Sequence, residues 1–289
     1  MANILCTGIA TLDIVNIVAS YPHEDDEIRI LAQEKRRGGN ATNTAVVLSQ
    51  LGHQCHWAGT LVDPEFHDAD SQTILEDLQQ NQINYEYCQF LNQGKVPTSY
   101  ITLSQDSGSR TISHYRDLPE LSFQVFSNIN LAQFDWFHFE GRNIEQTVQM
   151  MRYCKKLHPD IPISVEIEKL RKDSAKLIPP ADIVLFSKHF ALSQGFSSAK
   201  TFCQKHNTQY PDKTIICAWG DSGAAASEQQ QYYWQDALIV DAVDTLAAGD
   251  VFNAGIIDQL LRQKNITASL SYACHLAGRK CTRKGINQL

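Results

Sequence analysis

Short apolar runs alternate with amphipathic stretches along most of the chain, and this pattern predicts strands that alternate with helices. Continuous apolar runs are typical of strands in a parallel sheet that is covered on both faces. The predicted strands span residues 4–10, 55–59, 85–90, 136–139, 163–167, 183–186 and 214–218. The predicted helices span residues 41–51, 70–81, 144–157, 199–206, 249–262 and 266–283. We therefore expect a three-layer α/β/α fold with a mainly parallel central sheet.

Two pairs of β-like segments interrupt this alternation. They are residues 13–18, 28–34, 99–103 and 110–114. A polar turn separates the members of each pair, and the second pair has the pattern of a hairpin. Side chains that alternate between the two faces suit a small antiparallel sheet, which is too small to form a hydrophobic core of its own. We therefore expect it to serve as a lid or as a dimer surface.

The composition suits one large globular domain, since the chain has 289 residues that are 43% hydrophobic and 20% charged. We expect that domain to span residues 1–289, with β-strand lid segments inserted at residues 12–36 and 96–116. A formal net charge of −7 argues against nucleic-acid binding. No apolar run approaches the roughly 20 residues of a membrane span, and no secretory leader pattern opens the chain, so we expect a cytoplasmic protein. The eight cysteines form no CxxC pair and indicate reduced thiols.

Small residues mark the start of the predicted helix at 249–262. Ala247, Ala248 and Gly249 follow an extended apolar run at residues 237–240, and Asp250 stands directly behind them. The first N–H groups of a helix have no internal partner, so this strand-to-helix turn could bind a phosphoryl group as an anion hole. Asp250 could then take a proton from an attacking hydroxyl. The alternative is an ordinary helix start in which Asp250 interacts with the helix dipole.

A second small-residue turn lies before the helix predicted at residues 41–51. Gly39 permits close backbone approach to a ligand, and Asn40 is a good helix N-cap. Asn43 lies three residues further on, on the same helix face as Asn40, and amides donate and accept hydrogen bonds as a polyhydroxylated substrate requires. A capped helix alone would account for Asn40 but would leave Asn43 unexplained.

Charged residues follow several predicted strands. Asp13 comes just after the first strand, at the carboxyl edge where ligands of open α/β sheets bind, and could accept hydrogen bonds from vicinal hydroxyls. Arg110 could reach the site from the lid, or be a solvated side chain. Glu166 and Glu168 share one face of a strand, which disfavours a glycosidase pair and favours a cation or phosphate role. Strand-end charges in solvent are the alternative for Glu168.

Gly223 and Ala224 follow the apolar strand at residues 214–218 and indicate a tight turn where a nucleotide could approach the backbone. This signal is weak by itself. The chain contains neither G-x-x-x-x-G-K-[ST] nor G-x-G-x-x-G, so neither a Walker-type nor a dinucleotide-binding turn is supported.

Together these motifs resemble the ribokinase-like (phosphofructokinase-B) family of carbohydrate kinases over essentially the whole chain. The resemblance rests on the segments RGGNATN at 37–43 and DTLAAGD at 244–250. Segments at 107–112, 140–143, 164–169, 217–219 and 277–281 are similar to the branch that phosphorylates ketohexoses. The Asn-x-x-Glu motif of ribokinases is absent, since residues 187–190 read SKHF, and this also favours that branch. Ala247 stands where many members have glycine.

The resemblance implies transfer of the γ-phosphate of ATP to a ketohexose, with D-fructose giving fructose 1-phosphate. It makes Asp250 the general base and the N–H groups of Ala247, Ala248 and Gly249 the anion hole. It assigns the sugar to Asp13, Gly39, Asn40, Asn43 and Arg110, and the nucleotide to Ala218, Gly223, Ala224, Ala248, Gly278 and Cys281.

The resemblance also implies Mg²⁺ bound mainly through water, with Glu166 as a possible water-mediated ligand, and a homodimer formed through the lid. Two alternatives remain open. The chain could be another kinase of this family, acting on ribose, a different sugar or a nucleoside. It could also be a non-catalytic sugar- or nucleotide-binding protein on the same fold.

Overall fold

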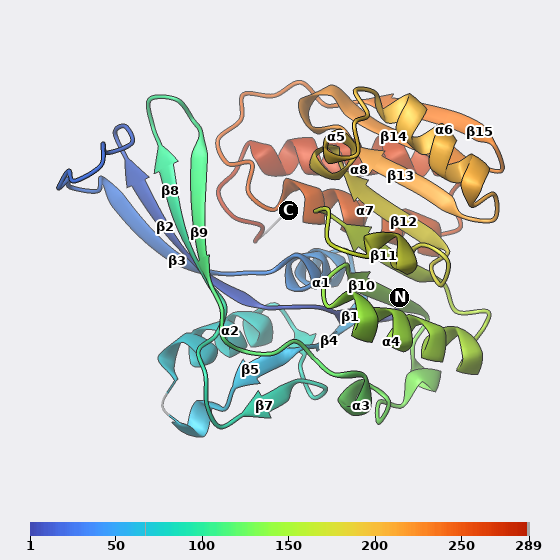
Figure 1. The fold of residues 1–289 in the computed structure, drawn as a ribbon, viewed down its shortest axis with the longest axis horizontal. Helices are drawn as coiled ribbons and strands as arrows, with labels where there is room; N and C mark the ends of the chain where they lie inside the picture. The colour runs from blue at the N-terminus through green and yellow to red at the C-terminus, as the bar shows by residue number, and fades with distance from the viewer. Residues whose placement is uncertain (67, 288–289) are drawn as a thin grey trace.

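A nine-stranded sheet forms the centre of the computed structural model, which describes residues 1–66 and 68–287 (Figure 1). Residues 67 and 288–289 of the predicted domain lie outside the described part. In spatial order the strands are β15 (Gln231–Asp236), β14 (Gly223–Glu228), β13 (Thr214–Ala218), β12 (Ile183–Ser187), β11 (Ile163–Ile167), β10 (Trp136–Glu140), β1 (Asn3–Thr7), β4 (Gln54–Ala58) and β6 (Ile83–Asn84). Neighbours from β13 to β6 pair in parallel, and β14 and β15 are antiparallel additions at one edge.

Helices cover both faces of this sheet. One face packs against α1 (Asn40–Gln50), α2 (Ala69–Gln80), α7 (Ala248–Leu261) and α8 (Ile266–Cys281). The other packs against α3 (Phe123–Phe126), α4 (Ile144–Leu157), α5 (Lys188–Ser193) and α6 (Ala199–Gln209). Strand β1 shows why two cores form: Ile4 and Cys6 belong to the first, while Leu5 belongs to the second. The predicted α/β/α fold class is confirmed.

A four-stranded sheet, here called the lid, stands apart from the central sheet (Figure 1). Its order is β3 (Ala32–Gly38), β2 (Thr11–Val18), β8 (Thr98–Ser104) and β9 (Arg110–Tyr115). The outer pairs are antiparallel, and the central pair of β2 with β8 is parallel because the chain builds α1 to β7 between them. Minor elements are the β5 (Thr60–Val62) and β7 (Gln89–Leu91) pair and the 3₁₀ turns η1 (Pro64–Phe66), η2 (Leu131–Gln133), η3 (Ser174–Leu177) and η4 (Gly220–Ser222).

Two predicted strands differ from the structure. The segment 85–90 contains a turn between β6 and β7, because the side chain of Asn84 accepts the Glu86 N–H at 2.8 Å and the Cys88 N–H bonds back to the Tyr85 carbonyl. The first strand ends at residue 7 rather than 10, because residues 8–10 lead out of the central sheet into lid strand β2, which begins at Thr11.

The extended apolar run at residues 237–240 is not a strand, and the prediction of a strand-to-helix turn before α7 is wrong in that respect. Ile239 is 98% exposed, so hydrophobicity alone gave a misleading signal there. The last strands are the hairpin β14–β15, which the sequence reading missed because one is rich in alanine and the other in polar and aromatic residues. The lid strand predicted at 28–34 is likewise displaced, to Ala32–Gly38.

The cysteines agree with the composition reading, since all eight are free thiols. Within the described residues, no group of three or more histidine, cysteine or acidic side chains is arranged to hold a metal ion. Over the same part of the chain, no helix combines the length and the apolar character needed to cross a membrane.

Candidate active site

The Gly38–Gly39 turn joins the lid to α1, and both positions are too crowded for a side chain. A Cβ at residue 38 would lie 2.3 Å from Asp13 Oδ2, and one at residue 39 would lie 2.2 Å from the Ile9 carbonyl oxygen. Gly39 also has φ 106°, which favours glycine. The turn therefore packs closely against Asp13, the third residue of strand β2, just before α1 begins.

Asn40 is the first residue of α1 and not its N-cap, contrary to the sequence prediction. Gly39 takes the N-cap position, and no side chain caps the helix there. Because the Asn40 amide is not needed for capping, its Nδ2 reaches across to Glu168 Oε2, at 3.3 Å.

Asn43 connects α1 to the N-terminus of α7. Its Nδ2 donates to Asp250 Oδ2 at 2.7 Å, and its Oδ1 accepts from Arg37 Nη1 at 2.8 Å. Arg37 is itself held by Thr42 Oγ1, at 2.9 Å, and by Asp77 of α2. This chain of bonds orients the amide and places its donor on the buried carboxylate of Asp250.

The start of α7 presents backbone donors. Ala247 is the N-cap residue in the left-handed region, with φ 62°, and no side chain caps the helix. The first bond along the helix runs from the Val251 N–H to the Ala247 carbonyl, and nothing lies within 4 Å of a Cβ built on Gly249. The Ala248 N–H bonds back to the Thr245 carbonyl at 3.4 Å, whereas the open space beside Gly249 leaves the helix N-terminus accessible to an anion, with Asp250 in the first turn.

Four carboxylates converge at this edge of the sheet: Glu140, Glu166, Glu168 and Asp250. Glu140 and Glu166 are register partners on β10 and β11. Burial, followed by the neighbouring carboxylates, raises the pKa of Glu166, and its Oε2 has no hydrogen-bond partner in the described part of the chain. Burial also raises the pKa of Asp250, although the Asn43 amide opposes this. Such a cluster is suited to proton transfer.

The lid brings two further predicted residues to the site in different ways. Asp13 accepts a hydrogen bond from Thr11 Oγ1 at 2.9 Å on its Oδ1. Arg110 of β9 donates from Nη1 to Thr245 Oγ1 at 3.0 Å, so it contacts the loop before α7.

The residues predicted for the nucleotide fall into two neighbouring groups. Ala218 and Ala224 are register partners on β13 and β14, and Gly223, with φ 128°, would collide with the Gln235 carbonyl if it carried a side chain. Gly278 of α8 packs against Leu238, just beyond β15.

Cys281 completes the second group through its backbone. Its carbonyl accepts the N–H groups of Val243 at 2.7 Å and Asp244 at 3.1 Å, which ties the end of α8 to the loop before Ala248. Ala224 has no exposed surface at all, so it can only pack behind the residues that would touch a ligand.

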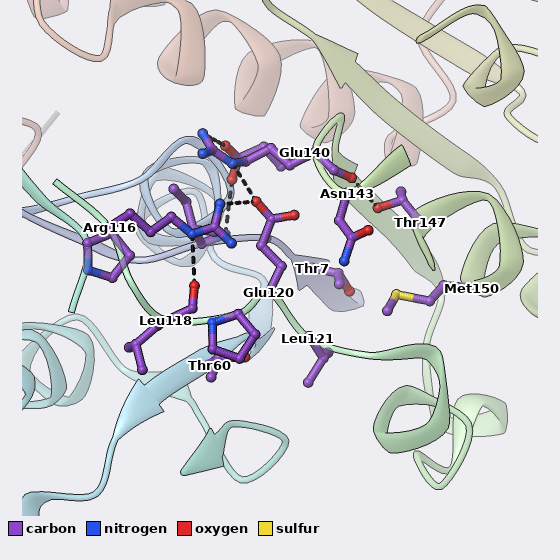
Figure 2. A pocket seen from close by; sticks show the side chains of 15 residues that line it. Thr7, Thr60, Arg116, Leu118, Glu120, Leu121, Glu140, Asn143, Thr147 and Met150 are labelled. Atoms are coloured by element: carbon purple, nitrogen blue, oxygen red, sulfur yellow. Dashed lines mark hydrogen bonds and ion pairs between the residues drawn. The ribbon is translucent and has the colours of Figure 1, made fainter. Parts of the chain in front are cut away.

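A pocket that the sequence reading missed adjoins the carboxylates (Figure 2). Arg116 and Arg142 both bind Glu120, and Arg142 Nη1 lies 3.5 Å from Glu140 Oε1. Burial and the charge of Arg142 lower the pKa of His114, on the lid. The position of Glu140 at the end of a buried strand was a usable signal, but the lid residues of this pocket had none.

Comparisons with known proteins agree with this geometry. Residues 1–288 match the model of the pfkB family of carbohydrate kinases. The chain is 35% identical to ketohexokinase of Mus musculus over 98% of this chain and 97% of that one. It is 24% identical to ribokinase of Bacillus subtilis over 94% and 90%. The structure of Arabidopsis thaliana ribokinase complexed with ribose and ATP superposes with a TM-score of 0.79 at 18% identity, over 98% and 94%. The chain therefore belongs to the pfkB family of carbohydrate kinases and has the ribokinase-like fold.

Proposed function

We propose that this kinase transfers the γ-phosphoryl group of ATP to a primary hydroxyl of a ketohexose, converting D-fructose to fructose 1-phosphate. The observation that carries the proposal is the 2.7 Å hydrogen bond from Asn43 to Asp250. This bond joins an amide suited to bind sugar hydroxyls to a buried carboxylate suited to act as a base, beside a helix N-terminus suited to bind an anion. The 35% identity to mouse ketohexokinase supports the choice of a ketohexose within the family.

In this proposal the sugar lies between the lid and the start of α1. Asp13, Asn40 and Asn43 bind its hydroxyls, and Gly39, which is partly exposed, offers its backbone. Asp250 accepts the proton of the attacking hydroxyl. Since burial raises the pKa of Asp250, it is a stronger proton acceptor than an exposed aspartate.

The phosphoryl group is transferred at the N-terminus of α7. The N–H groups of Ala247, Ala248 and Gly249 stabilise the negative charge that develops on it, and Arg110 reaches this loop from the lid. Residues Ala218, Gly223, Ala224, Gly278 and Cys281 line the nucleotide side.

The carboxylate of Glu166 is suited to hold Mg²⁺ through bridging water molecules. Glu166 offers a buried carboxylate oxygen without a partner in the described residues, and no group of three or more ligand side chains surrounds a single point there. Glu166 would hold the hydrated ion, which when bound neutralises phosphate charge.

We further propose one domain over residues 1–289 and a homodimer formed through the lid. Large apolar side chains on or beside the lid strands are between 41% and 56% exposed: Ile28, Ile30, Leu31, Tyr100, Ile112 and Tyr115. A second copy would remove them from water. The cytoplasmic location stays a prediction.

A substrate panel tests the activity. The protein with ATP and Mg²⁺ is assayed against D-fructose, D-ribose, D-glucose and adenosine, and the product is identified by ³¹P-coupled NMR. We expect the highest kcat/KM for fructose, with phosphate on carbon 1. Faster turnover of ribose or adenosine would overturn the ketohexose proposal, and absence of turnover with any acceptor would favour a binding protein.

Replacing the base should remove turnover and spare binding. Asp250→Asn is expected to lower kcat by about 10³-fold, because the amide cannot accept the proton, while calorimetric binding of the sugar changes by less than about threefold. Asp160→Asn, at an exposed turn, is the matched control and should keep full activity. Turnover of Asp250→Asn equal to that of the wild type would exclude this residue as the base.

The backbone conformation of Ala247 should determine the kcat of phosphoryl transfer. Ala247→Gly should keep kcat within about threefold, since glycine adopts φ 62° freely, whereas Ala247→Val should lose at least about 30-fold. Gln263→Val is the control, because Gln263 has φ 56° at the far end of α7 and strain there should cost stability alone. Equal kcat for the two Ala247 variants would show that this conformation does not matter.

Light scattering tests the dimer. At micromolar concentration we expect twice the chain mass of 32.5 kDa, and Tyr100→Glu on the lid should shift the protein toward one chain mass. Leu192→Glu on α5 is the control, since its side chain is similarly exposed, 49% against 42%, but lies away from the lid. A wild-type protein of 32.5 kDa would contradict the proposed homodimer.

A further inference from the structure

Lys280, in the last turn of α8, is fully buried although it carries a charge. Its Nζ donates to the Asp244 carbonyl oxygen at 2.6 Å and lies 3.3 Å from Asp244 Oδ2. A buried ammonium is costly unless it is paired, so its place at the start of the loop before α7 calls for an explanation. The chemistry proposed above does not use it.

Asp244 is the point where several elements meet. Its Oδ2 accepts from Arg36 of lid strand β3 at 3.2 Å and from the Gly285 N–H at 3.0 Å. Its Oδ1 accepts the Leu246 N–H at 2.9 Å, which shapes the loop from within. The Lys280 ammonium is the only one of these partners that binds both the side chain and the backbone carbonyl of Asp244 within the described contacts.

The opposite charges of Lys280 and Asp244 each favour the ionised form of the other. Burial lowers the pKa of Lys280, and Asp244 opposes that effect. Burial alone would raise the pKa of Asp244, but the N–H groups of Gly285 and Leu246, with Lys280 and Arg36, lower it overall. Both partners therefore have reason to remain ionised in the folded protein.

The loop needs such support because its last residue is strained. Ala247 has φ 62°, a conformation that alanine holds only where its surroundings fix it. Lys280 fixes the loop through the Asp244 carbonyl, and the carbonyl of Cys281, the next residue of α8, accepts two N–H groups of the loop. The end of α8 thus holds residues 243–244, three to four positions before the strained Ala247.

We propose that Lys280 is a positioning residue for phosphoryl transfer, whose buried ammonium holds the loop 243–247 so that the first N–H groups of α7 point at the transferred group. This inference rests on the proposed function for its catalytic consequence. The same contacts would also exist in a purely structural ion pair, and the two roles differ in what happens to kcat when the charge is removed from a folded protein.

The test compares Lys280→Met with the wild type. We expect kcat to fall at least about 50-fold, of the order found when one transition-state donor is lost, while the sugar KM changes by less than about threefold. Hydrogen–deuterium exchange of the segment 243–250 should accelerate at least about tenfold, with other segments unchanged. Lys264→Met, an exposed lysine between α7 and α8, is the control and should match the wild type.

Two further variants distinguish the loss of the Lys280 charge from a failure of the variant to fold. Lys280→Arg keeps the cation and should retain at least about ten times the kcat of Lys280→Met. If Lys280→Met alone does not fold, Lys280→Met with Asp244→Asn removes both charges of the pair, and its kcat should remain low. Equal kcat of the Arg and Met variants, or recovery of the double variant to within threefold of the wild type, would overturn the proposal.

The outcome is distinguishable from failure of the proposed substrate. If the wild type prefers ribose or another acceptor, the ketohexose proposal fails, and the Lys280 variants are compared with that acceptor. If no acceptor is phosphorylated, exchange of the segment 243–250 still decides whether Lys280 holds the loop. Unchanged exchange in Lys280→Met would overturn the inference in either case.

Discussion

The buried hydrogen bond from Asn43 to Asp250 is the contact on which the rest of the site depends. It joins the first turns of α1 and α7, which are more than two hundred residues apart in sequence, with a donor–acceptor distance of 2.7 Å. A buried carboxylate requires such a donor, and the donor in turn is oriented by Arg37. Small shifts of either helix would break the bond, so the packing of the central sheet determines the geometry of the chemistry.

The carboxylates at this edge of the sheet repel one another, which opposes the arrangement but favours a ligand that brings positive charge. Burial, and after it the neighbouring carboxylates, raise the pKa values of Glu140, Glu166 and Asp250. Arg142 offsets part of the charge at Glu140, but Glu166 keeps an unpartnered oxygen within the described residues. A site that concentrates negative charge in this way is suited to a ligand that brings a hydrated cation, as a nucleotide with Mg²⁺ does.

The lid and α8 meet at the loop before α7. Arg36 and Arg110 reach the loop from lid strands β3 and β9, while Lys280 reaches it from beneath. The strained Ala247 at the end of the loop is therefore held from both sides, which is how an unfavourable backbone conformation persists in a native protein.

The sequence by itself determined the elements with strong local signals. Strands at 163–167 and 214–218 and the helix at 144–157 were predicted to the residue, because apolar runs and helical spacing are local properties. Asn43 and Asp250 were singled out because each lies in a short small-residue motif, and the structure places the two side chains 2.7 Å apart. Only the tertiary structure decided that Gly39 and not Asn40 caps α1, that residues 237–240 lie exposed outside the sheet, and that Lys280 lies under Asp244. Those outcomes depend on crowding and burial between distant segments, and one-dimensional patterns carry no record of either.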